Sequence, residues 1–127
     1  MKTTVTALLC CFVASISYAN SVCDKPRDDF DGLYCLNKVY QQADNDLNQV
    51  YKKLAGKLDA DGKKSLKRGQ LNWIESRNEN CSMKKGNSFY VNLSCATETT
   101  ISRTQFLQDR HRECVSAGCM NSKLSGE

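Results

Sequence analysis

The sequence has little of the two residues that tight turns use most. It contains one proline and seven glycines among 127 residues, and a sandwich or barrel of many short strands would need more of both. After residue 20 it also lacks an apolar run approaching the roughly 18 residues that a membrane-spanning helix requires. These absences argue against an all-β fold and against membrane insertion, and they favour long helices.

Residues for catalysis or metal binding are also scarce. His111 is the one histidine and has no evident partner for nucleophilic catalysis. With Cys114 and Cys119 it forms a set of only three metal-capable residues, without the paired spacing of a zinc site. The basic run over residues 63–68 has no interleaved aromatic residue, so it is typical of a solvated face rather than of a nucleic-acid site. We therefore expect no catalytic activity, cofactor, metal ion or nucleic-acid partner.

The first 19 residues have the pattern of a secretory signal peptide. Lys2 supplies a positive start, residues 5–16 form an apolar run, and Ser17 and Ala19 place small residues before a cleavage site. Residues 20–127 are then expected to form a single domain in a periplasmic or secreted protein. Loss of Lys2 lowers the formal net charge from +4 to +3.

Cysteine is abundant, with eight in the chain. Two lie in the signal peptide, and an even number of the rest in a small secreted domain predicts three disulfides. Pairing in chain order is the expected pattern, and the main alternative joins Cys23 to Cys114 or Cys119. The last pair in chain order closes a small ring, so its contribution to stability should be slight. The expected pairs are Cys23–Cys35, Cys81–Cys95 and Cys114–Cys119.

The spacing of apolar residues predicts three helices. Between residues 36 and 58 they recur every three or four positions, which marks one face of a helix about thirty residues long. Asp61-Gly62 indicates a turn, and the same spacing returns over residues 66–81 and 93–107. The tail from Gly118 onward is small and polar, and we expect it to be loose. The fold class predicted is all-α: a small antiparallel three-helix domain stapled by disulfides.

Polar residues occupy positions where a simple helical bundle would place leucine. They share faces with apolar neighbours, and a buried polar group without a partner costs about 1–3 kcal/mol. We therefore expect a hydrogen-bonded network across the helix seam, with Asp44 facing Arg77 or Arg103. The same residues could instead line a ligand pocket, but the pairing rule favours the structural network. The seam residues are Asp44, Asn48, Tyr51, Gln70, Trp73, Arg77 and Arg103.

Two motifs then make a family resemblance specific. The first is Tyr40-x-x-Ala43-Asp44-x-x-Leu47-Asn48-x-x-Tyr51, and the second is Leu66-x-x-x-Gln70-x-x-Trp73-Ile74-x-x-Arg77-x-x-x-Cys81. Over residues 23–107 the chain resembles the LprI-type lysozyme inhibitors, which are small secreted or lipid-anchored bacterial proteins. One departure is Gly69, where alanine is usual. Helix propensity predicts that this glycine costs about 1 kcal/mol relative to alanine.

The resemblance implies a helical, non-enzymatic inhibitor of lysozyme or a related peptidoglycan hydrolase. Such an inhibitor would present a rigid protrusion to the substrate cleft. The best candidate is the loop between the second and third helices, which a Cys81–Cys95 disulfide would hold at both ends. It could equally be an ordinary crossover loop. The candidate partner-binding residues are Lys84, Asn87, Ser88 and Tyr90.

Net charge gives no support to that partner. Animal-type lysozymes are usually basic, so a chain of net charge +3 gains no long-range attraction toward them. Docking would then depend on local carboxylates. The alternative function is an envelope module that binds peptidoglycan, another anionic glycan or a secreted toxin, which mild basicity suits better.

Overall fold

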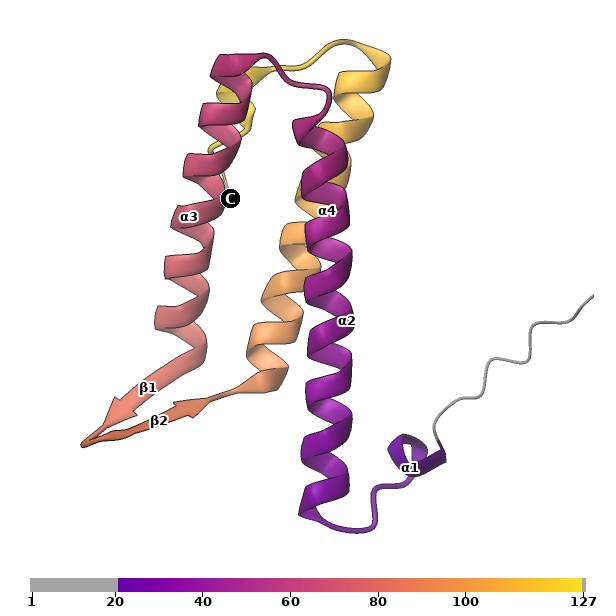
Figure 1. Ribbon diagram of the computed structural model, residues 1–127, viewed down its shortest axis with the longest axis vertical. Helices are drawn as coiled ribbons and strands as arrows, with labels where there is room; N and C mark the ends of the chain where they lie inside the picture. Colours follow the sequence, from indigo (N-terminus) through magenta and orange to yellow (C-terminus); the bar gives the residue numbers. More distant parts are fainter. Residues whose placement is uncertain (1–20, 127) are drawn as a thin grey trace, which may run out of the picture.

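Three long helices make up most of the protein, as the apolar spacing predicts. The computed structural model describes residues 21–126, so the expected signal peptide lies outside the described residues. Helices α2 (Asp29–Ala55), α3 (Ala60–Cys81) and α4 (Leu93–Ser116) run along the long axis of the molecule (Figure 1). A short helix α1 (Ser21–Asp24) precedes them, and a 3-10 turn η1 (Asn121–Lys123) follows. The fold is therefore a small, disulfide-stapled, all-α domain.

Each long helix begins at a side chain that caps it. Asp28 accepts a hydrogen bond from the Asp31 backbone N–H, Asp59 from that of Gly62 and Asn92 from that of Cys95. These bonds satisfy backbone donors that a helix leaves unpaired in its first turn. The preference of aspartate and asparagine for the capping position thus sets where the three long helices start.

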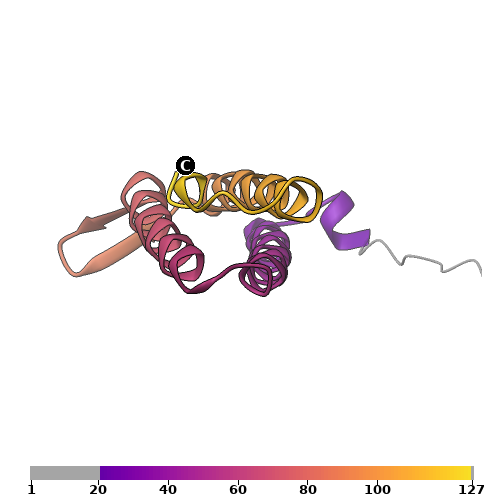
Figure 2. The ribbon, with the colours of Figure 1, turned by 90° about the horizontal axis from the view of Figure 1, so that it is seen from above.

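The helices pack unevenly around the core. α4 lies along α2 over much of its length, whereas α2 and α3 make few direct contacts. The view from above shows α2 and α3 as separate columns with α4 beside both (Figure 2). The core is a cluster of leucines with one tryptophan: Leu47, Leu54, Leu58, Leu66, Trp73, Leu107 and Leu124.

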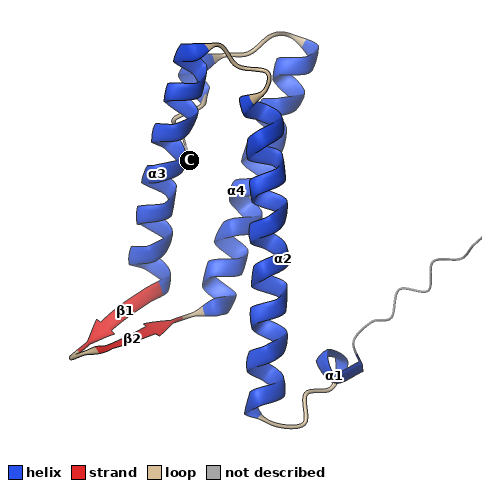
Figure 3. Ribbon diagram, viewed as in Figure 1, coloured by secondary structure: helices blue, strands red, loops and turns tan. Residues whose placement is uncertain are grey.

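The segment between α3 and α4 is a β-hairpin rather than an irregular loop. Strands β1 (Ser82–Lys85) and β2 (Ser88–Val91) pair antiparallel, with Met83 opposite Tyr90. Gly86 sits at the turn with φ of 61°, a conformation that glycine adopts without steric cost. The hairpin extends away from the helices at one end of the molecule (Figure 3).

All three cysteine pairs follow chain order. In the structure Cys23 is bonded to Cys35, Cys81 to Cys95 and Cys114 to Cys119. The first joins the segment before α2 to that helix, the second joins the ends of α3 and α4, and the third closes the turn after α4. No described helix is long and apolar enough to cross a membrane.

The C-terminal tail differs from the loose segment expected. Leu124 is 1% exposed and belongs to the core, and Arg103 donates a hydrogen bond to the Gly126 carbonyl at 2.8 Å. Near η1, the Gly62 N–H and the Asn121 side chain both donate hydrogen bonds to the Asp59 carboxylate, and these bonds lower the pKa of Asp59. The tail packs against the helices because burial of the apolar Leu124 side chain is favourable. The small, polar composition of the tail as a whole does not reveal this single contact.

Gly69 makes room for this tail, which corrects the expectation from helix propensity. A Cβ atom at residue 69 would lie 2.6 Å from the Leu124 carbonyl oxygen and 2.9 Å from the Ser125 Cα. These are backbone atoms and cannot move without displacing the tail. The glycine therefore permits a close approach that a Cβ atom would block.

Candidate functional site

The hairpin carries all four residues proposed from the sequence to bind a partner. Lys84 lies on β1, Asn87 at the turn, and Ser88 and Tyr90 on β2. Every residue of both strands is exposed, so neither face of the hairpin covers a core. The structure thus places the four together on one projecting element.

Sequence reasoning missed the apolar side chains beside them. Phe89 is 74% exposed, and Met83 and Val91 are also largely exposed. The Lys84 Nζ lies 5.5 Å from the centre of the Phe89 ring, a cation–π distance. The run Phe89-Tyr90-Val91 could have indicated a strand with these side chains on it, because consecutive aromatic and β-branched residues favour a strand.

The base of the hairpin is fixed to the helices. Cys81 is buried and bonded to Cys95, and its carbonyl accepts a hydrogen bond from the Asn92 N–H at 2.8 Å. The Ser82 hydroxyl donates to the Asn78 carbonyl at 2.6 Å. An isolated two-stranded hairpin is marginally stable in water, so these links at both strands hold the projection in one orientation.

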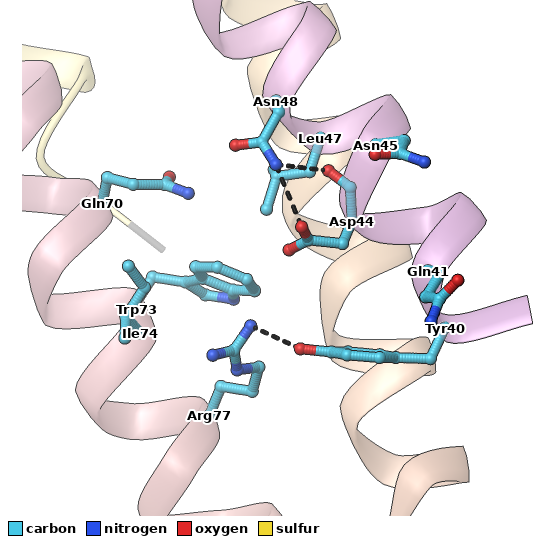
Figure 4. A pocket seen from close by; sticks show the side chains of 10 residues that line it. All are labelled: Tyr40, Gln41, Asp44, Asn45, Leu47, Asn48, Gln70, Trp73, Ile74 and Arg77. Carbon is cyan, nitrogen blue, oxygen red and sulfur yellow. Dashed lines mark hydrogen bonds between the residues drawn. The ribbon is translucent and has the colours of Figure 1, made fainter. Parts of the chain in front are cut away.

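Most of the expected seam residues line an open hollow between α2 and α3 (Figure 4). Its volume is about 360 Å³, which lies at the lower end of the range for small-ligand sites. Of the seven seam residues, Tyr51 and Arg103 do not border it. The lining residues are Tyr40, Gln41, Asp44, Asn45, Leu47, Asn48, Gln70, Trp73, Ile74 and Arg77.

The hydrogen bonds in this hollow differ from the expected network. Asp44 accepts a hydrogen bond from Asn48 on its own helix at 3.0 Å, rather than pairing with Arg77 or Arg103. Arg77 instead lies over the Trp73 ring at 5.0 Å and donates to the Tyr40 hydroxyl at 3.3 Å. Both arginines have other partners in place of Asp44: Arg77 contacts side chains of α2 and α3, and Arg103 contacts α3 and the tail.

Arg103 belongs to a second cluster, which shares Gln70 with the hollow. It is 3% exposed, donates to the Gln70 side-chain oxygen at 3.1 Å, and lies over the Phe106 ring. It also donates a hydrogen bond to the Gly126 carbonyl in the tail. Tyr51 packs against the leucine core. The seam residues therefore form two clusters that meet at Gln70, one open to solvent and one closed by the tail.

Neither the hairpin nor the hollow offers a metal site. Across residues 21–126 no group of three or more histidine, cysteine, aspartate or glutamate side chains is placed to hold a metal ion. The hollow presents hydrogen-bond donors and acceptors beside an aromatic wall, and the hairpin presents exposed apolar and basic side chains. Both arrangements are suited to non-covalent binding.

Comparison with known proteins gives one match. Residues 23–107 match the family described as "Lysozyme inhibitor LprI", and this span contains both the hollow and the hairpin. No curated protein and no solved structure matches the chain. Because the match covers most of the 127 residues, the chain belongs to the LprI family of lysozyme inhibitors.

Proposed function

We propose that this protein binds and inhibits lysozyme or a related peptidoglycan hydrolase, as a non-enzymatic periplasmic or secreted protein. Membership of the LprI family carries the proposal. Three disulfides in a small domain suit an oxidising compartment outside the cytoplasm, where such hydrolases act.

The hairpin β1–β2 is the proposed inhibitory element. Side chains alternate between the two faces of a strand, so Tyr90 lies with Met83 on one face and Phe89 with Lys84 on the other. A substrate cleft encloses an inserted segment from both sides, and this hairpin has an exposed aromatic side chain on each. Because its base is already fixed, little conformational entropy is lost on binding.

Lysis of bacterial cell walls by a panel of lysozymes tests this proposal. We expect the mature protein to slow lysis by at least one of them and to co-elute with it. Replacing both Phe89 and Tyr90 by alanine should weaken inhibition about tenfold or more. Val115→Ala, which removes an exposed apolar side chain far from the hairpin along the chain, is the control. Unchanged lysis with every lysozyme in the panel would reject the function.

A second candidate function is the binding of a cell-wall glycan in the hollow between α2 and α3. Its lining supports this candidate, because amides, the Asp44 carboxylate and the Arg77 guanidinium surround the Trp73 ring. Sugars are recognised by such convergent polar groups beside an aromatic surface. Purified cell-wall sacculi separate the two candidates. Sacculi that retain the wild-type protein but not Asp44→Ala, without any effect on lysozyme, would favour the glycan.

A further inference from the structure

The first turns of α2 expose an unusual number of large apolar side chains. Phe30 is 83% exposed and Leu33 is 56% exposed. The first buried residue of this helix is Ala43. Its first turns extend past the start of α4 (Figure 1), and further along the helix Leu36 and Val39 share an open hollow with the first turns of α4. Exposed apolar surface of this kind marks an interaction site. We call the following residues the α2 docking surface: Phe30, Leu33, Tyr34, Leu36 and Val39.

This surface is held in a defined shape. The Cys23–Cys35 disulfide ties the preceding segment to α2, and Arg27 forms an ion pair with Asp31 at 2.8 Å. Beside the disulfide lies an open hollow of about 450 Å³ whose lining includes Leu36 and Val39. Side chains of a partner would therefore meet a preformed apolar recess.

Charge identifies the kind of partner that fits this recess. Residues 24–46 contain six aspartates against three basic residues, a net charge of −3, although the whole chain carries +4. Asp28 and Asp29 lie beside Phe30 at the start of the helix. The positive excess thus resides in the rest of the chain, and the acidic first half of α2 is complementary to a basic protein surface.

We propose that the α2 docking surface binds a basic hydrolase through its apolar side chains and through Asp28 and Asp29, which share an open hollow with Leu33 and Leu36. This inference rests on the proposed function. A chain of positive net charge gains no long-range attraction toward a basic lysozyme, but docking through an acidic region of the chain avoids this difficulty. The hairpin and the start of α2 lie at the same end of the molecule (Figure 1). A partner seated on α2 is thus at the end from which the hairpin projects.

Matched pairs of variants test the surface by affinity for a basic animal-type lysozyme. Leu33 and Leu71 are both 56% exposed, but Leu71 lies on α3. We expect Leu33→Ala to raise the Kd about fivefold or more and Leu71→Ala to leave it unchanged. Asp29→Lys should slow association, whereas Glu75→Lys on α3, with an identical change in net charge, should not. Acetylating the lysines of the lysozyme should weaken binding to the wild type.

The outcomes separate this inference from the function on which it rests. If the wild type inhibits lysozyme but the two variants within each pair bind it equally well, the docking surface is wrong and the inhibitory function stands. If the wild type binds no lysozyme, the proposed function fails. A wild-type dimer that Leu33→Ala dissociates would show that a second copy of this chain covers the surface, which would also overturn the inference. Circular dichroism checks that every variant remains helical.

Discussion

Arg77 shows how a single side chain links the two least connected helices. It is half-buried on α3, lies over the Trp73 ring, and donates to the Tyr40 hydroxyl on α2. Few other contacts join these helices directly. A part-buried hydrogen bond contributes about 0.5–1.5 kcal/mol, and a cation–π contact at a semi-exposed site about 0.5–1 kcal/mol.

We therefore expect Arg77→Ala to lower the free energy of unfolding by about 1–2 kcal/mol, because Tyr40 loses its partner and Trp73 its cover. Lys63→Ala, at an exposed position of the same helix, should change it by less than about 0.5 kcal/mol. Urea denaturation followed by circular dichroism measures both. Equal midpoints for the two variants would show that Arg77 does not hold α2 and α3 together.

At the scale of elements, the hairpin depends on the helices that flank it. All residues of its strands are exposed, and the strands bury no core of their own. The Cys81–Cys95 disulfide holds the end of α3 against the start of α4, so it fixes both the helix pair and the base of the hairpin. The Cys114–Cys119 disulfide closes a shorter ring beyond α4.

Replacing Cys81 and Cys95 together by alanine should destabilise the protein by about 3 kcal/mol in the chain-entropy model. It should also weaken inhibition, since the hairpin loses its fixed base. Replacing Cys114 and Cys119 should have a smaller effect on the melting temperature and none on inhibition. Thermal unfolding of both double variants gives the comparison, and equal losses would contradict it. Non-reducing peptide mapping checks the pairing itself.

At the scale of the whole molecule, the tail closes the core along α3. Leu124 fills a place among the leucines. Gly69 lets the tail backbone pass close to α3, and Gly62 leaves room for the Asn121 side chain. Arg103 connects α4 to both partners, through Gln70 on α3 and Gly126 in the tail. Three segments distant in sequence thus meet at one place.

Gly69→Ala is the variant that separates helix propensity from tertiary packing. Overpacking against backbone costs about 1–3 kcal/mol, which exceeds the gain of about 1 kcal/mol in helix propensity. We expect a lower melting temperature. Gly32→Ala on α2 is the control, since a Cβ there meets nothing within 4 Å, and it should raise the melting temperature. A more stable Gly69→Ala protein would show that the tail does not pack against α3.

The sequence alone predicted the three long helices and the family, and it favoured chain-order cysteine pairs over the alternative that joins Cys23 to the tail. Apolar spacing of three and four residues is a local property, so it predicts α2, α3 and α4 without knowledge of their neighbours. Whether Asp44 meets an arginine, where Leu124 lies, and which apolar residues of α2 remain exposed depend on how the helices are placed relative to one another. The tertiary structure decided these features, because the partner of each side chain lies far away in the sequence.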